Sequence, residues 1–190
     1  KAQDRVFSEL KDELKKENII LTDYSKIPEE VKVEFRDYYK SFIFPVLTPL
    51  AIDASRPFPF LLNKSLNIVV KLSREGEDFF CIIQVPQILK RFKEFNKDGK
   101  KYLVQLEDII RDNLGTLFEG YEVIESALFR LTRDAEMIID EDEAEDLLIE
   151  IKNSLQQRKW GEPVRLELNK NTPMVLLDFL LETFDNPYLH

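Results

Sequence analysis

The sequence has few of the residues on which most enzyme chemistry depends, and it has no long apolar run. It contains one histidine, His190, and one cysteine, Cys81. A Ser-His-Asp triad, a histidine-based metal site or a histidine phosphocarrier therefore has no internal candidate. A single cysteine cannot form an internal disulfide, so we expect a reducing, cytoplasmic setting. Because no apolar stretch approaches the about 20 residues of a membrane helix, we expect no transmembrane segment and no secretory leader.

Glycine is scarce as well. The five glycines form neither the GxGxxG nor the GxxxxGK[ST] pattern, whose backbone amides hold the phosphates of a nucleotide. Cys81 lies in an apolar, strand-like run and is interpreted as a core residue rather than a nucleophile. We therefore expect no catalytic residue, no cofactor site and no metal site within this chain.

The charge is unevenly distributed. Acidic residues outnumber basic ones by 36 to 27, which gives a net charge of −9. Nine of the acids lie between Asp134 and Ile151, and the rest of the chain is formally neutral. These acids favour the start of a helix over 141–158, because carboxylates are stabilised there and a calcium loop would need a central glycine. The negative balance argues against a free-standing nucleic-acid binder.

Apolar periodicity predicts helices and strands mixed along the chain. The pattern indicates an α+β domain, with a mixed β-sheet covered by helices on both faces in three layers and a helical N-terminal lead-in. Met137–Ile139 is predicted as a short additional strand. One predicted helix begins at Pro28 and carries an apolar stripe to Phe42. The other predicted helices span 4–17, 105–117, 141–158 and 173–184. The main predicted strands span 66–72, 79–85, 121–133 and 164–168.

The segment from Phe44 to Asn67 has an unusual composition, with four prolines and three phenylalanines. The prolines break any long helix, and the aromatic rings argue against a solvated loop. One interpretation is a loop that covers the chain's own core. The other is a surface that another domain or a second subunit covers.

Four basic residues are candidates for binding phosphate. Arg130 and Arg133 lie at the end of a predicted strand, where guanidinium groups can present paired donors to phosphate oxygens. Arg56 and Lys64 flank the aromatic-proline segment. The alternative interpretation is a solvated strand end whose cations pair with nearby acids and contribute little.

Several strings, in order and at similar spacing, resemble the head-domain signature of the bacterial polyphosphate kinases. The resemblance covers about Val6 to Leu189. The strings are Phe44–Asp53 (FPVLTPLAID), Arg56–Leu61 (RPFPFL), Ser65–Val70 (SLNIVV), Leu106–Ile110 (LEDII), Phe129–Glu136 (FRLTRDAE), Glu141–Leu148 (EDEAEDLL) and Trp160–Glu167 (WGEPVRLE).

The resemblance implies a parent phosphotransferase that moves the terminal phosphate of ATP reversibly onto polyphosphate through a phosphohistidine. It places the Mg²⁺ and ATP ligands in catalytic domains outside this chain. Residues 1–18 would then be the end of a preceding helical domain or a lead-in helix, and residues 19–190 the head, or middle, domain. The implied partners are those other domains and a second subunit of a homo-oligomer.

Two further hypotheses follow from the residues. The chain can be a stand-alone dimerisation module whose contact surface is the aromatic-proline segment, in which case it self-associates. It can also bind polyphosphate directly through Arg56, Lys64, Arg130 and Arg133, which predicts an affinity that falls as salt rises. Neither hypothesis requires catalysis by the fragment itself.

Overall fold

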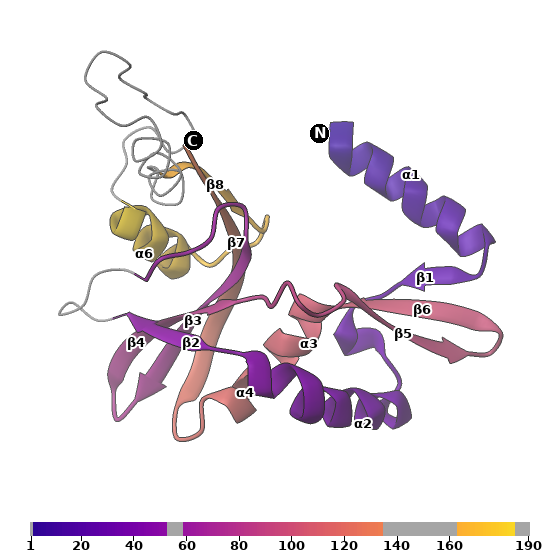
Figure 1. Ribbon diagram of the computed structural model, residues 1–190, viewed down its shortest axis with the longest axis horizontal. Coiled ribbons are helices and arrows are strands. Elements are labelled where there is room, and N and C mark those ends of the chain that lie inside the picture. The colour runs from indigo at the N-terminus through magenta and orange to yellow at the C-terminus, as the bar shows by residue number, and fades with distance from the viewer. Residues whose placement is uncertain (1, 53–58, 135–162, 185–190) are drawn as a thin grey trace, which may run out of the picture. The chain divides into compact units, whose positions relative to one another are not determined.

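The computed structural model describes residues 2–52, 59–134 and 163–184. The predicted α+β class is confirmed. The strands, however, form two sheets, one in each of two compact units (Figure 1), where the sequence suggested a single mixed sheet. Unit 1 comprises residues 1–47 and 85–121, and unit 2 comprises residues 48–84 and 122–190.

Unit 1 opens with α1 (Ala2–Lys16), which confirms the helix predicted over 4–17. Its apolar residues share one face, as an amphipathic helix requires, and three of them, Val6, Phe7 and Leu10, are exposed. Asn18 adopts a left-handed backbone conformation with φ of 59° and ends the helix. Whether residues 1–18 belong to a preceding domain stays a prediction.

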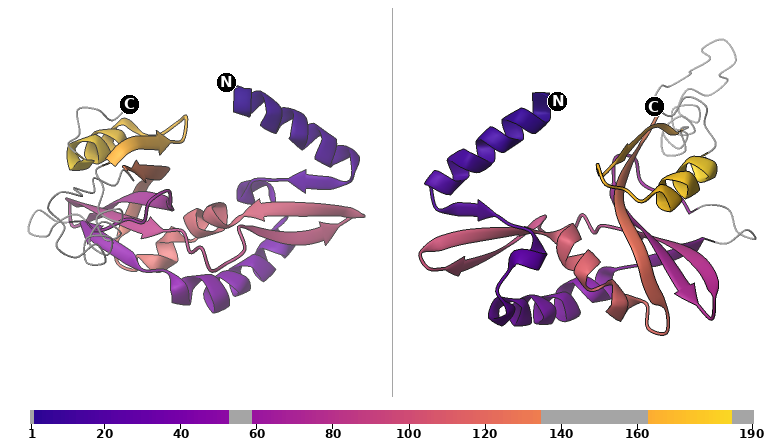
Figure 2. Two further views of the ribbon diagram at one scale, coloured as in Figure 1. Left: turned by 45° about the horizontal axis from the view of Figure 1, so that its top comes forward. Right: turned by 180° about the vertical axis from the view of Figure 1, so that it is seen from behind.

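The sheet of unit 1 has the order β1-β6-β5. β1 (Ile19–Leu21) runs parallel to β6 (Lys100–Gln105), and β5 (Phe92–Lys97) runs antiparallel to it. Asp98 and Gly99 join β5 to β6 with φ values of 52° and 71°, the backbone of a two-residue hairpin turn. The β5–β6 hairpin forms a long ribbon (Figure 2).

Helix α2 (Glu29–Tyr38) packs on this sheet through a buried aromatic contact. Phe35 is fully buried and meets the ring of Phe95 edge-on at 5.7 Å. The predicted helix beyond Tyr38 continues only as a π-helical turn (Tyr39–Ile43) and a 3₁₀ turn (Phe44–Val46). Phe42, expected in the buried stripe, is therefore exposed.

The helix predicted over 105–117 is two shorter helices, α3 (Leu106–Asp112) and α4 (Leu114–Leu117). Asn113 separates them. Its side-chain amide donates to the carbonyl of Ile109 at 2.8 Å, and its own carbonyl accepts from the Thr116 hydroxyl at 2.8 Å. Asparagine side chains compete in this way with the helical backbone bonds.

Unit 2 holds a five-stranded antiparallel sheet of order β2-β4-β3-β7-β8. The predicted hairpin is confirmed as β3 and β4, joined at Glu75 and Gly76. Strand β2 lies in the proline-rich segment and was not predicted; Pro49 is tolerated there because it begins an edge strand. The strands are β2 (Pro49–Ile52), β3 (Leu66–Arg74), β4 (Glu77–Gln84), β7 (Glu122–Arg133) and β8 (Pro163–Leu168).

Helix α6 (Met174–Phe184) covers one face of this sheet (Figure 1) and confirms the last predicted helix. Phe179 stacks on Phe80 of β4 at 4.1 Å between ring centroids. Leu181, expected in the buried stripe, is 43% exposed. The core under α6 contains Leu61, Val69, Ile82, Ala127, Phe129, Leu131, Leu176, Leu180 and Phe184.

Some predictions fall outside the described residues. These are the strand at Met137–Ile139, the helix over 141–158 and the candidate Arg56. Of the acidic run only Asp134 is described, and it is exposed. No helix in the described part of the chain has the length and apolar content needed to cross a membrane.

Candidate anion-binding site

Strand β7 presents two different faces because successive side chains of a strand point to opposite sides. Ala127, Phe129 and Leu131 are buried in the core with α6. Leu128 and Arg130 alternate with them and face the other way. The alternation therefore places a guanidinium group on the sheet face opposite α6.

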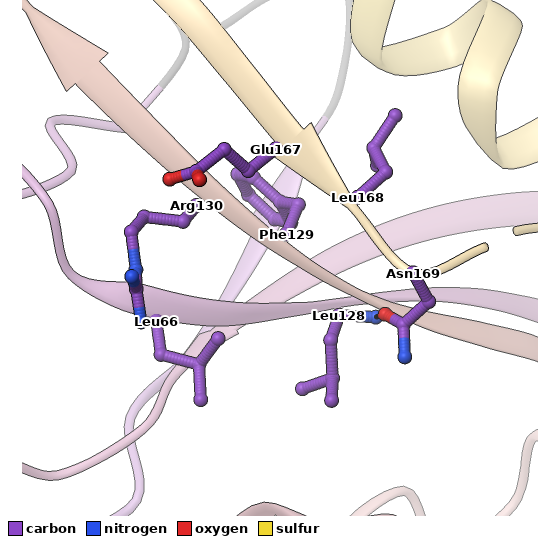
Figure 3. A pocket seen from close by; sticks show the side chains of 7 residues that line it. All are labelled: Leu66, Leu128, Phe129, Arg130, Glu167, Leu168 and Asn169. Carbon is purple, nitrogen blue, oxygen red and sulfur yellow. Dashed lines mark hydrogen bonds between the residues drawn. The ribbon is translucent and has the colours of Figure 1, made fainter. Parts of the chain in front are cut away.

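An open pocket of about 230 Å³ lies over β3, β7 and β8 (Figure 3). At one end Arg130 extends toward Leu66, its cross-strand neighbour on β3. At the other end Leu128 lies beside Asn169. The lining residues are Leu66, Leu128, Phe129, Arg130, Glu167, Leu168 and Asn169.

Arg130 is the cation of this pocket. Its Nε atom is buried and has no hydrogen-bond partner. Glu167 lies directly opposite on β8, but its carboxylate is 3.0 Å from Arg165 and makes no ion pair with Arg130. Within the described ranges the Arg130 guanidinium takes part in no ion pair. A buried donor without a partner is unfavourable. Since Nε itself is shielded from solvent, an acceptor from a ligand can meet only the terminal nitrogens of the guanidinium.

Asn169 supplies a second donor. Its Oδ1 accepts a hydrogen bond from the backbone N–H of Leu128 at 2.8 Å, so the side chain adds one more rung to the β7–β8 ladder. This bond assigns the oxygen, and the Nδ2 group is left to donate. The carbonyl of Asn169 accepts from the Thr172 hydroxyl at 2.8 Å, which fixes the residue before α6 begins.

The other candidates lie nearby but do not line the pocket. Lys64 is exposed, has a φ of 61°, and bonds through its backbone N–H to the carbonyl of Leu131 at 2.8 Å. Arg133 turns toward the segment before β3. Its Nε donates to the carbonyl of Leu61 at 3.4 Å, and its guanidinium lies 5.4 Å from the centre of the Phe60 ring. Burial lowers the pKa of Arg133, yet a guanidinium stays charged in proteins.

The structure thus separates the two arginines that the sequence grouped, because residues three apart on a strand point to opposite faces of the sheet. Sequence reasoning did not identify Glu167 and Asn169 as site residues. The alternating pattern of 164–168 predicted β8, but it did not reveal that β8 pairs with β7.

Cys81 is a buried core residue, as the sequence predicted. It is 3% exposed, and burial raises the pKa of its thiol to about 12. A thiol in this state is a poor nucleophile at neutral pH. The described residues hold no group of three or more histidine, cysteine, aspartate or glutamate side chains placed to bind a metal ion.

Comparison with known proteins identifies related sequences. The family model described as "Polyphosphate kinase middle domain" matches residues 30–187. A polyphosphate kinase of Staphylococcus saprophyticus is 44% identical over 163 residues, and one of Synechocystis is 41% identical over 192 residues. These alignments cover 86% and 94% of this chain but only 23% and 26% of the relatives. The chain therefore spans about a quarter of their length.

The fold is also similar to a solved structure. The crystal structure of polyphosphate kinase from Porphyromonas gingivalis superimposes with a TM-score of 0.75 and 23% sequence identity. The superposition covers 97% of this chain and 27% of that one. At this identity the likeness concerns the fold alone.

Proposed function

Since this chain belongs to the polyphosphate kinase middle-domain family, we propose that it is the head domain of an enzyme that reversibly transfers the terminal phosphate of ATP to inorganic polyphosphate. The observation that carries this proposal is the family match over residues 30–187. Relatives at 36–44% identity that bear the name polyphosphate kinase support it.

The chemical step is proposed to occur in other domains of the parent protein, which also supply the phosphohistidine and the Mg²⁺ and ATP ligands. Transfer through a phosphohistidine needs an imidazole held by neighbouring groups. The single histidine of the chain is His190, outside the described residues, and the single cysteine is buried with a raised pKa. The fragment alone is proposed to be inactive.

The intact parent protein provides the direct test. Incubation with ATP, Mg²⁺ and a polyphosphate primer should lengthen the primer, and ADP with polyphosphate should yield ATP. The 190-residue chain should catalyse neither reaction, so its rates of primer extension and ATP formation should not exceed those of a heat-denatured sample. An intact protein that fails to extend the primer would refute the assignment of activity.

Within the parent enzyme, this domain is proposed to help form a dimer. The alternative function is that of a stand-alone dimerisation module. Both are supported by apolar side chains exposed near the start of the aromatic-proline segment in unit 1. Phe42, Phe44 and Val46 are exposed by 59%, 43% and 43%. Large exposed apolar groups in proximity are typical of contact surfaces. Sedimentation of the chain at micromolar concentration should show a dimer, whereas a strict monomer would contradict self-association through this domain alone.

A further inference from the structure

The pocket on β3, β7 and β8 combines a guanidinium that makes no ion pair among the described residues, an amide group left to donate and a small volume. We propose that it binds an inorganic polyphosphate chain, with Arg130 and Asn169, at opposite ends of the pocket, as donors to different phosphoryl groups. The inference rests on the proposed function for its ligand and goes beyond it, because it assigns a phosphate contact to the head domain itself.

The surroundings of Arg130 strengthen its attraction for an anion. Leu66 and Leu128 line the same pocket, and apolar walls lower the effective dielectric around the charge. A guanidinium can donate two parallel hydrogen bonds to the oxygens of one phosphate, and such charge-assisted bonds are stronger than neutral ones.

The pocket is small and open. About 230 Å³ is less than the about 300–1,000 Å³ of a typical small-molecule site. A phosphoryl group fits within it, and the rest of a longer ligand would extend beyond it. Lys64 lies two residues before Leu66, is exposed and makes no ion pair among the described residues, so it is available to the next phosphate along a chain.

The negative charge of Glu167 disfavours an anionic ligand in this pocket. Its carboxylate faces the same pocket, and its attraction to Arg165 compensates only part of its negative charge. Because this charge repels phosphate, the affinity of the wild-type pocket is moderate, and removal of the charge strengthens binding.

Calorimetric titration of tripolyphosphate into the 190-residue chain at low salt tests the site. Arg130→Gln should weaken binding about tenfold or more. Arg74→Gln is the matched control, since it removes the same charge from the opposite end of β3, and its affinity should stay near that of wild type. Circular dichroism and thermal unfolding verify that both variants fold.

Two further variants keep the test decisive if Arg130→Gln is unstable. Asn169→Asp retains an acceptor for the Leu128 N–H and replaces the Nδ2 donor with a negative oxygen. It should weaken binding by at least as much as Arg130→Gln. Glu167→Gln should strengthen binding severalfold.

The proposal is overturned if tripolyphosphate shows no saturable binding, or if Arg74→Gln and Arg130→Gln weaken binding equally. ATP, titrated in parallel, should bind no more tightly than tripolyphosphate; tighter binding of ATP would make the pocket a nucleotide site instead. Kinase activity of the intact parent is measured separately, so an active parent with unchanged binding in the variants refutes the pocket assignment alone.

Discussion

Arg91 and Glu107 form an ion pair in which the carboxylate is 2% exposed and the guanidinium 47% exposed, with 2.5 Å between Nη2 and Oε1. The backbone reinforces this contact, because the N–H of Leu106 donates to the carbonyl of Arg91 at 2.8 Å. The two bonds attach the segment before β5 to the start of α3. The other oxygen of Glu107 is buried and has no partner, so Arg91 is the main compensation for this charge.

Replacing Arg91 should destabilise unit 1 strongly. Arg91→Ala leaves a buried carboxylate without a counter-charge, and we expect the free energy of unfolding to fall by about 3 kcal/mol. Lys101→Ala is the control, because Lys101 pairs with Glu94 where both side chains are largely exposed. It should cost about 0.5 kcal/mol or less. Urea unfolding measures both, and similar losses would show that the Arg91–Glu107 pair stabilises unit 1 no more than an exposed pair does.

Asp108, the residue after Glu107, should make the free energy of unfolding depend on pH. Burial, and then the negative charge of Glu107, raise the pKa of the Asp108 carboxyl. A carboxyl with a raised native pKa binds more protons in the folded state, so stability is lost as pH rises from the unfolded value of about 3.9 through the native value.

Asp108→Asn should therefore increase the free energy of unfolding at pH 7 and leave it nearly unchanged at pH 3. Denaturant unfolding at the two pH values measures the difference. Asp37→Asn, which changes an exposed side chain of α2, serves as the control. A destabilised Asp108→Asn at pH 7 would show that the ionised carboxylate is favourable where it lies.

Two neighbouring leucines of α6 should respond very differently to truncation. Leu180 is fully buried in the core of unit 2, whereas Leu181 is 43% exposed. Leu180→Ala should lower the free energy of unfolding by about 2–5 kcal/mol, through lost apolar burial and the cavity left behind. Leu181→Ala should change it by about 0.5 kcal/mol. Thermal unfolding of the pair measures the contrast, and equal effects would place α6 differently on the sheet.

Cys81 provides a probe of global unfolding because it is the only thiol of the chain. With a pKa of about 12 and 3% exposure, it should resist an aromatic disulfide reagent at pH 8. One equivalent should react once denaturant is added. Rapid labelling of the native chain would mean that β4 opens locally.

The elements that the sequence predicted well are those whose local pattern agrees with their packing. The helices beginning near Ala2, at Glu29 and at Met174 carry apolar stripes and end signals. Strands β3 and β4 carry apolar runs, and β7 alternates buried and less buried residues. The β5–β6 hairpin was missed although Asp98-Gly99 is a strong turn signal. Its strands are rich in lysine, and Phe95 is the only residue of β5 that is buried, so the apolar alternation is faint.

The candidate site was predicted only in part. Arg130 was selected because a guanidinium can bind phosphate. Its neighbours depend on the strand order, which places residues 66, 130 and 167 side by side on three adjacent strands. Arg133 was grouped with it because both lie at the same strand end, although residues three apart on a strand point to opposite faces. Pairing between distant segments is set by tertiary contacts and has no local signal in either strand.

Asn169 joins three parts of unit 2 through one side chain and one carbonyl. Its Oδ1 ends the β7–β8 ladder, its side chain lines the pocket, and its carbonyl holds Thr172 just before α6. A ligand on the Nδ2 group would therefore restrain the connection from sheet to helix. Amide hydrogen exchange in the first turn of α6 should slow when the pocket is filled, which makes this helix a remote reporter of occupancy.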